Sequence, residues 1–177
     1  RSNHTMAKRI RLSIVIPAYN EELRIKQTLK TFYKYFTKKY KTEIIVVCDG
    51  NTDKTPEIVE NFSKTHKAVK LLKFSNRLGK GGGTLAGLKA AHGNFIGYVD
   101  ADSSILSEDF NNLIETLLRN NLDSAIASRY LPQSKIKVKQ PFYRKLLSRG
   151  WNLIVRTVFQ IPFTDTQCGA KVFTSKS

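Results

Sequence analysis

The sequence predicts an α/β protein with an open, mainly parallel sheet flanked by helices, the layout of a Rossmann-like nucleotide-binding sandwich. Short apolar runs alternate with segments whose apolar residues recur at helical spacing. Such alternation produces right-handed βαβ units, in which helices cover both faces of a parallel sheet. Polar residues also follow the apolar runs directly, at the positions where sheets of this kind bind ligands. These two patterns define the predicted fold class.

The predicted strands are short runs rich in β-branched and aromatic residues, which are typical of buried strands. The first run, LSIVI, ends at Pro17, which lacks a backbone donor. The second run is followed by the turn sequence Asp49-Gly50-Asn51. In chain order, the predicted strands cover residues 12–16, 44–47, 69–74, 95–99 and 125–127.

Helical spacing of apolar residues predicts a helix after each of the first four strands. The second helix has Thr55 as N-cap and Pro56 at its first helical position, where both residue types are favoured. The third follows a glycine-rich stretch at 79–83, and the fourth has Ser107-Glu108-Asp109 as its cap. The inward-facing residues fall within 25–36, 58–62, 85–91 and 110–118.

With 177 residues and 41% hydrophobic content, the chain can form one globular domain with a real core. Residues 1–6 resemble an expression scar followed by a start Met, which leaves 7–177 as the predicted domain. No apolar run approaches the ~20 residues that span a bilayer, and the start does not resemble a secretory signal, so a cytoplasmic location is expected. Cys48 and Cys168 lack metal-ligand spacing and are expected to be reduced, buried thiols.

The charge balance is strongly basic, with 30 Lys and Arg against 14 Asp and Glu and a net charge of +16. Nucleic acid, an anionic membrane surface and phosphorylated substrates are the candidate partners for such a charge. Residues 135–156 combine Lys and Arg with aromatic and aliphatic residues and contain no acid. This pattern suits an anionic membrane surface, although a core helix with a solvated outer face would also show it. Nucleic-acid binding is disfavoured because no groove-reading motif accompanies the charge.

Polar residues collect directly after every predicted strand. Because the carboxyl ends of parallel strands lie at one edge of a sheet, these residues should converge there. They are Tyr19-Asn20-Glu21-Glu22, Asp49, Asn76-Arg77, Asp100 with Asp102, and Ser128-Arg129.

Several of these residues also have a simpler interpretation. Asn20 would serve as the N-cap of the first helix, with Glu21 and Glu22 favourable at its positive end. Asp49 and Asp53 would be turn and cap residues. Arg77 would be a solvated loop charge. The sequence alone leaves these alternatives open.

Asp100 and Asp102 follow the fourth strand as a D-x-D pair. Residues two apart on a strand point to the same side, so the two carboxylates would form a hard oxygen site. Such a site suits Mg²⁺ or Mn²⁺ and leaves room for water and phosphate ligands. The glycines at 79–83 match neither the P-loop pattern nor G-x-G-x-x-G, and they are expected to let a helix pack close to the sheet and a nucleotide.

The motifs at 17–22, 47–53, 76–82 and 100–102 resemble, in order, those of family 2 glycosyltransferases with the GT-A fold. Those at 128–130, 144–150 and 165–173 are similar to the polyprenyl-phosphate sugar synthases, especially the dolichyl-phosphate β-glucosyltransferase branch. The chain departs from the family pattern at Cys48, where Asp is usual, and at Leu78, which resembles an insertion that could shift Arg77.

The resemblance implies an inverting, metal-dependent transfer of a sugar, glucose favoured, from a nucleotide-sugar such as UDP-glucose to a polyprenyl phosphate. Asp100 and Asp102 would hold Mg²⁺ or Mn²⁺, and Asp102 and Arg129 would be catalytic. The acceptor phosphate would be bound by Arg129, Arg144 and Ser148. The nucleotide-sugar would be bound by Pro17, Tyr19, Glu21, Asp49, Arg77, Lys80 and Asp100.

The resemblance further implies a protein on the cytoplasmic face of a membrane. Family members continue past this point with acceptor-side helices and often membrane segments, so 7–177 would be a catalytic domain that lacks them. A family 2 enzyme acting on a saccharide hydroxyl and a basic nucleic-acid-binding module remain alternatives. A nucleotidyltransferase should carry a glycine-rich loop after the first strand, where this chain has Ala18-Tyr19-Asn20-Glu21.

Overall fold

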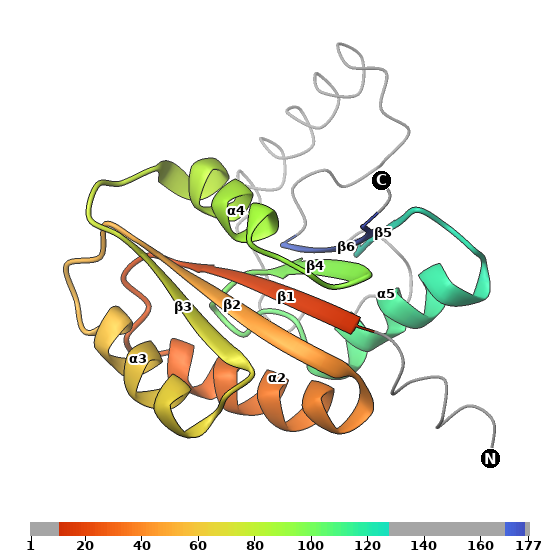
Figure 1. The fold of residues 1–177 in the computed structure, drawn as a ribbon, viewed down its shortest axis with the longest axis horizontal. Helices are drawn as coiled ribbons and strands as arrows, with labels where there is room; N and C mark the ends of the chain where they lie inside the picture. Colours follow the sequence, from red (N-terminus) through yellow and green to blue (C-terminus); the bar gives the residue numbers. More distant parts are fainter. Residues whose placement is uncertain (1–10, 128–168, 176–177) are drawn as a thin grey trace, which may run out of the picture. The chain divides into compact units, whose positions relative to one another are not determined.

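A computed structural model describes residues 11–127 and 169–175. These residues form a six-stranded sheet with the order β3-β2-β1-β4-β6-β5 (Figure 1). β1 pairs in parallel with both β2 and β4, and β2 pairs in parallel with β3. The strands are Arg11–Ala18 (β1), Lys41–Asp49 (β2), Val69–Phe74 (β3), Phe95–Val99 (β4), Ser124–Ile126 (β5) and Ala170–Thr174 (β6). The predicted parallel α/β sheet is therefore confirmed.

One strand was not predicted. β6 pairs antiparallel with β4, from Phe95 opposite Thr174 to Val99 opposite Ala170, and it separates β4 from β5. Its sequence, AKVFT, is short, and its strand conformation depends on the partner that it pairs with.

The helices lie on both faces of the sheet. In Figure 1, α4 covers one face, whereas α2, α3 and α5 cover the other. No helix in the described part of the chain is long and apolar enough to cross a bilayer. The helices are Ile25–Lys39 (α2), Thr55–Thr65 (α3), Gly79–Lys89 (α4) and Ser107–Arg119 (α5).

The two faces are packed differently. Phe32, Phe36 and Phe110 fill the face under α2 and α5, with ring centroids 5.5–5.7 Å apart. The other face is built on the buried aliphatic side chains of Val15, Ile45 and Val47, and α4 approaches it through Gly87, where a Cβ would overlap Val15. Close approach of α4 brings its first turn to the edge at which the strands end, which positions the site described below.

Some element ends differ from the predicted ones. β1 continues through Pro17 to Ala18, which is possible because β4 pairs only with 12–15 and leaves one side of Pro17 without a ladder partner. Thr55, the predicted N-cap, is instead the first residue of α3. The Asp53 carboxylate accepts hydrogen bonds from the Thr55 amide and hydroxyl. α5 has Leu106 at the N-cap position with no side-chain cap bond.

Candidate functional site

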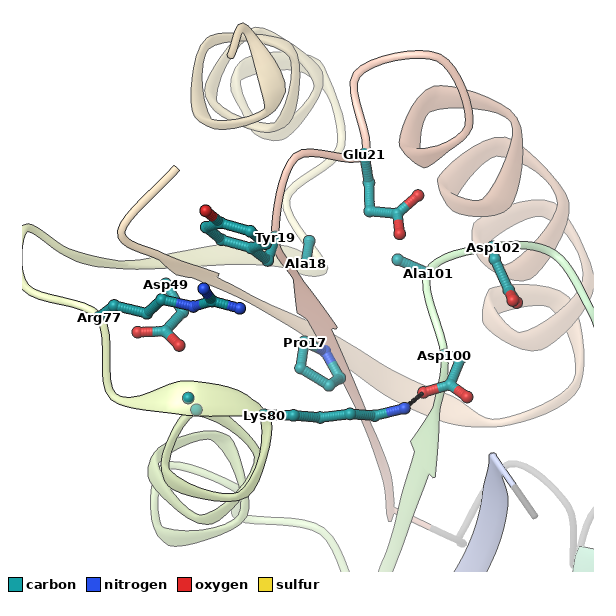
Figure 2. Close-up of a pocket in the computed structure, with 12 residues that line it drawn as sticks. Pro17, Ala18, Tyr19, Glu21, Asp49, Arg77, Lys80, Asp100, Ala101 and Asp102 are labelled. Carbon is teal, nitrogen blue, oxygen red and sulfur yellow. Dashed lines mark ion pairs between the residues drawn. The ribbon is translucent and has the colours of Figure 1, made fainter. Parts of the chain in front are cut away.

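A cleft lies at the edge where the parallel strands end (Figure 2). Every described residue that the sequence predicted for donor or metal binding lines it. They come from the ends of β1, β2 and β4 or the residues just after them, from the segment between β3 and α4, and from the start of α4. The lining comprises Pro17, Ala18, Tyr19, Glu21, Asp49, Arg77, Gly79, Lys80, Gly83, Asp100, Ala101 and Asp102.

Asp49 is the last residue of β2, and only 5% of its surface is exposed. The backbone N–H of Leu78 donates to its Oδ1 at 2.6 Å. The apparent insertion at Leu78 therefore has a function in the fold, because its amide orients one oxygen of a buried carboxylate. Burial without a partner would be costly for that charge.

Arg77 and Tyr19 form one wall of the cleft. The Arg77 guanidinium carbon lies 3.9 Å from the centroid of the Tyr19 ring, a cation–π contact. Figure 2 shows Arg77 above the Asp49 carboxylate and beside Tyr19. The inserted Leu78 has thus not moved Arg77 out of the cleft, which Arg77 lines although it is exposed.

The loop after β1 is tied to the turn before α3. Asn20, at φ 54°, accepts the Thr52 amide at 3.0 Å, and the Glu21 amide donates to the Thr55 hydroxyl at 2.8 Å. The Glu22 amide donates to Asp53 at 3.0 Å. Asn20 is therefore not the N-cap of α2, which begins four residues beyond Glu21 with Arg24 at the cap position. These bonds place Glu21 on the cleft, where its carboxylate pairs with Arg24 at 2.7 Å.

Asp53 has a structural role. Burial raises its pKa, but hydrogen bonds from Thr55 and from the Glu22 amide outweigh this and hold the pKa below its ordinary value of 3.8. The turn-and-cap interpretation holds for Asp53, whereas Asp49 faces the cleft.

Asp100 follows the last residue of β4 and is held from several directions. The Tyr98 hydroxyl donates to its Oδ1 at 2.8 Å, and Lys80 Nζ lies 2.9 Å from the same oxygen. The Asp100 amide donates to the Gly169 carbonyl at 3.1 Å. A side chain at Gly169 would overlap Oδ2 of Asp100, so this glycine provides space for the carboxylate.

Asp102 lies in a turn. Its Oδ1 accepts the Ser104 amide at 2.9 Å, across Ser103 with φ 58°. The predicted reason for pairing Asp100 with Asp102 was strand alternation, and that reason is wrong because β4 ends at Val99. Both aspartates nevertheless line the same cleft, on the side opposite Arg77 and Tyr19 (Figure 2).

The donor set fits a divalent metal. Asp100 Oδ1 already binds a cation, the Lys80 ammonium, and both aspartates offer hard oxygen ligands. No group of three or more His, Cys, Asp or Glu gathers among the described residues. Mg²⁺ is often held by one or two carboxylates, with waters and substrate phosphates as the remaining ligands.

Cys48 is a free, buried thiol next to Asp49, as predicted. Burial raises the pKa of this thiol to about 12, and the nearby Asp53 charge adds to the effect. Cys48 does not line the cleft.

Other predicted residues lie outside the described part of the chain. They are Ser128, Arg129, Arg144, Ser148, Cys168 and the basic segment 135–156. Conversely, no sequence motif indicates the roles of the Leu78 amide and the Tyr98 hydroxyl. Gly169 belongs to the motif at 165–173, but that motif does not indicate that it makes room for Asp100.

The fold is that of GT-A glycosyltransferases. The mannosyltransferase PcManGT from Pyrobaculum calidifontis, solved in complex with GDP-Man and Mn²⁺, superposes with a TM-score of 0.65 at 22% identity. The superposition covers 94% of this chain and 45% of that one. At this identity the likeness establishes the fold alone.

The sequence profile of Glycosyl transferase family 2 matches residues 13–176. The chain therefore belongs to glycosyl transferase family 2, as the motifs predicted.

Two relatives carry the name of the branch that the motifs indicated. The dolichyl-phosphate beta-glucosyltransferase of Dictyostelium discoideum is 32% identical over 180 residues, which cover 95% of this chain and 55% of the relative. A dolichyl-phosphate beta-glucosyltransferase of Trichomonas vaginalis is 35% identical over 173 residues, with 92% and 53% covered. The chain thus spans about half the length of these relatives.

Proposed function

We propose that residues 7–177 are the donor-binding catalytic domain of an inverting, metal-dependent glucosyltransferase. It moves glucose from UDP-glucose to a polyprenyl phosphate of the dolichyl type. The observation that carries this proposal is the cleft, in which residues from β1, β2, β4 and α4 that match the family's donor motifs meet. The names of the relatives support the choice of glucose and of a dolichyl phosphate acceptor.

The nucleotide lies between Arg77 and Asp49 in this proposal. Asp49 Oδ1 is occupied by the Leu78 amide, so Oδ2 accepts the imide N–H of the base. Tyr19 and Arg77 present flat faces that suit stacking on a base. Lys80 and Glu21 lie nearer to Asp100, where the diphosphate and sugar belong (Figure 2).

Asp100 and Asp102 hold the metal, Mg²⁺ or Mn²⁺, which when bound stabilises the negative charge of the departing diphosphate. Tyr98 fixes the orientation of Asp100 through its 2.8 Å hydrogen bond. The absence of a side chain at Gly169 makes room for the Asp100 carboxylate itself. The protein thereby prepares Asp100 before the donor arrives.

The acceptor determines what further chemistry is needed. A phosphate monoester has a second pKa of about 6, so it is largely dianionic at neutral pH. A nucleophile of this kind needs orientation and charge compensation, and it does not need a general base. Arg129, Arg144 and Ser148 provide that compensation in the proposal. A single displacement by the acceptor oxygen converts the α-linked donor into a β-linked product.

A polyprenyl phosphate resides in a membrane, so the protein acts at one. The proposed location is the cytoplasmic face, where the basic, aromatic segment 135–156 meets anionic headgroups. Vesicle binding that is lost at high salt would support this location.

The test is a donor screen with and without a short polyprenyl phosphate. The protein is incubated with UDP-glucose, UDP-GlcNAc or GDP-mannose and with Mg²⁺ or Mn²⁺, and release of the nucleotide diphosphate is measured. We expect UDP release from UDP-glucose, and we expect the lipid phosphate to stimulate it. Asp102→Asn should lower the rate of this release at least 10²-fold, a typical loss for an essential electrostatic contact. Asp123→Asn, remote from the cleft, is the matched control.

Three outcomes contradict the proposal. Preferential use of GDP-mannose would exclude the UDP-glucose assignment. Stimulation by free saccharides in place of the lipid phosphate would identify a transferase for hydroxyl acceptors. Unaltered turnover in Asp102→Asn would remove that aspartate from the mechanism.

A further inference from the structure

Lys80 forms an ion pair inside the donor cleft. It is the second residue of α4, and its side chain crosses the cleft beside Pro17 to reach Asp100 (Figure 2). The Nζ–Oδ1 distance is 2.9 Å. Among the residues that the structure describes, Lys80 is thus the cation paired with Asp100.

The position of Lys80 matters because Asp100 has little room for two cations. Oδ1 already accepts the Tyr98 hydroxyl in addition to Lys80. Oδ2 lies against the backbone of Gly169, so the carboxylate is confined on that side. A divalent ion that binds Asp100 must therefore take the place of the ammonium group or repel it at short range.

We propose that Lys80 is a displaceable counter-ion. It neutralises Asp100 in the metal-free protein and moves to the donor diphosphate when a divalent cation binds Asp100. The inference rests on the metal site of the proposed function, and it adds a competition between a side chain and the metal. No covalent step is involved, because one ion pair is exchanged for another.

The exposure of the pair makes the exchange easy. The Lys80 side chain is 69% exposed and that of Asp100 is 23% exposed. Ion pairs of this kind are weak, so displacement of Lys80 should weaken metal binding only about two- to fivefold. The flexible stem of a lysine also permits the ammonium group to reach another anion in the same cleft.

The exchange predicts that removing Lys80 changes the affinity for the metal and the affinity for the nucleotide in opposite directions. Without Lys80, the metal should bind more tightly to the nucleotide-free protein, because its competitor is gone. Without Lys80, a nucleotide diphosphate should bind less tightly in the presence of metal, because a phosphate ligand is gone. A residue that only stabilised the fold would not change these two affinities in opposite directions.

The experiment measures Mn²⁺ binding to the nucleotide-free protein by electron paramagnetic resonance of the free ion, and UDP binding at saturating Mn²⁺ by calorimetry. Lys80→Met removes the charge and keeps most of the side-chain length. Lys89→Met is the matched control, since it makes the same charge change at the other end of α4. Asp100→Asn reports whether Mn²⁺ uses this site. Thermal denaturation verifies that each variant is folded.

We expect Lys80→Met to bind Mn²⁺ about two- to fivefold more tightly and UDP several-fold more weakly than the parent and Lys89→Met. Equal or weaker Mn²⁺ binding by Lys80→Met would overturn the counter-ion role and leave the metal site intact. Mn²⁺ affinity that Asp100→Asn does not change would instead contradict the metal site of the proposed function. The two failures are therefore distinguishable.

Discussion

The two ends of β2 each carry a carboxylate, and the protein uses them differently. Glu43, near the start of the strand, accepts the Ser13 hydroxyl at 2.6 Å, the His92 amide at 2.7 Å and Lys70 Nζ at 2.7 Å. These partners come from β1, β3 and the segment between α4 and β4. Glu43 therefore joins several elements at the edge remote from the cleft.

Asp49, at the end of the same strand, is even more buried, yet among the described residues its carboxylate accepts only the Leu78 amide. Asp49 lines the cleft, with its carboxylate below the Arg77 side chain in Figure 2. A carboxylate with all of its partners supplied by the fold stabilises that fold, whereas one that is buried and only half satisfied is suited to a ligand. The comparison supports the proposal that Asp49 binds a ligand, whereas Glu43 joins elements of the fold.

Among the changes that test this comparison, Asp49→Asn should have the largest effect. Loss of a charge-assisted hydrogen bond to the base should cost about 1.5–3 kcal/mol, or roughly 10- to 100-fold in UDP affinity. The free energy of unfolding should change little, because the charge is buried and only half satisfied. Calorimetric titration with UDP and urea denaturation measure the two quantities. Unchanged UDP affinity would show that Asp49 serves the fold, as Glu43 does.

Glu43→Gln should show the opposite behaviour. At pH 7 the free energy of unfolding should fall by about 1–2 kcal/mol, because the carboxylate loses charge-assisted bonds. UDP affinity should not change, because Glu43 does not line the cleft. Urea denaturation measures the first effect and calorimetry the second.

The destabilisation by Glu43→Gln should depend on pH. Burial raises the pKa of Glu43, but the bonds from Lys70, Ser13 and the His92 amide outweigh this and lower the pKa below its ordinary value of 4.5. A lowered pKa gives stability that is fully present above pH 4.5 and is lost as the pH falls through the folded-state value. The difference between parent and variant should therefore shrink under acid. A difference that stays constant at low pH would exclude the Glu43 charge as its source.

The sequence predicted the fold well because the pattern that encodes it is local. Apolar periodicity and turn residues marked all five predicted strands and all four helices within a few residues. The errors arose where a distant partner determines conformation. β6 becomes a strand because it pairs with β4, and β1 can continue through Pro17 because β4 leaves that side unpaired.

The sequence predicted which residues line the site better than it predicted how their side chains are arranged. In a parallel sheet, strand ends share one edge, so the residues after β1, β2 and β4 had to converge. Side-chain direction did not follow from strand alternation once β4 ended at Val99 and Asp102 entered a turn. The hydrogen bond from the Leu78 amide to Asp49 could not be predicted either, because every residue except proline has a backbone N–H and the sequence does not distinguish this one.

That backbone contribution gives the smallest expected effect, which concerns only one oxygen of Asp49. Leu78→Pro removes the N–H that donates to Oδ1, and the Leu78 φ of −84° is close to the value that proline requires. Leu78→Ala keeps the N–H and removes the side chain, so it is the matched control. Without the hydrogen bond that orients Asp49, UDP should bind several-fold more weakly. This loss of affinity is smaller than the one expected for Asp49→Asn, which removes the carboxylate charge. Calorimetric titration with UDP should show weaker binding in Leu78→Pro than in Leu78→Ala. If the two variants bind UDP equally, the amide does not orient Asp49 for the ligand, and the half-satisfied state of this carboxylate loses its functional meaning.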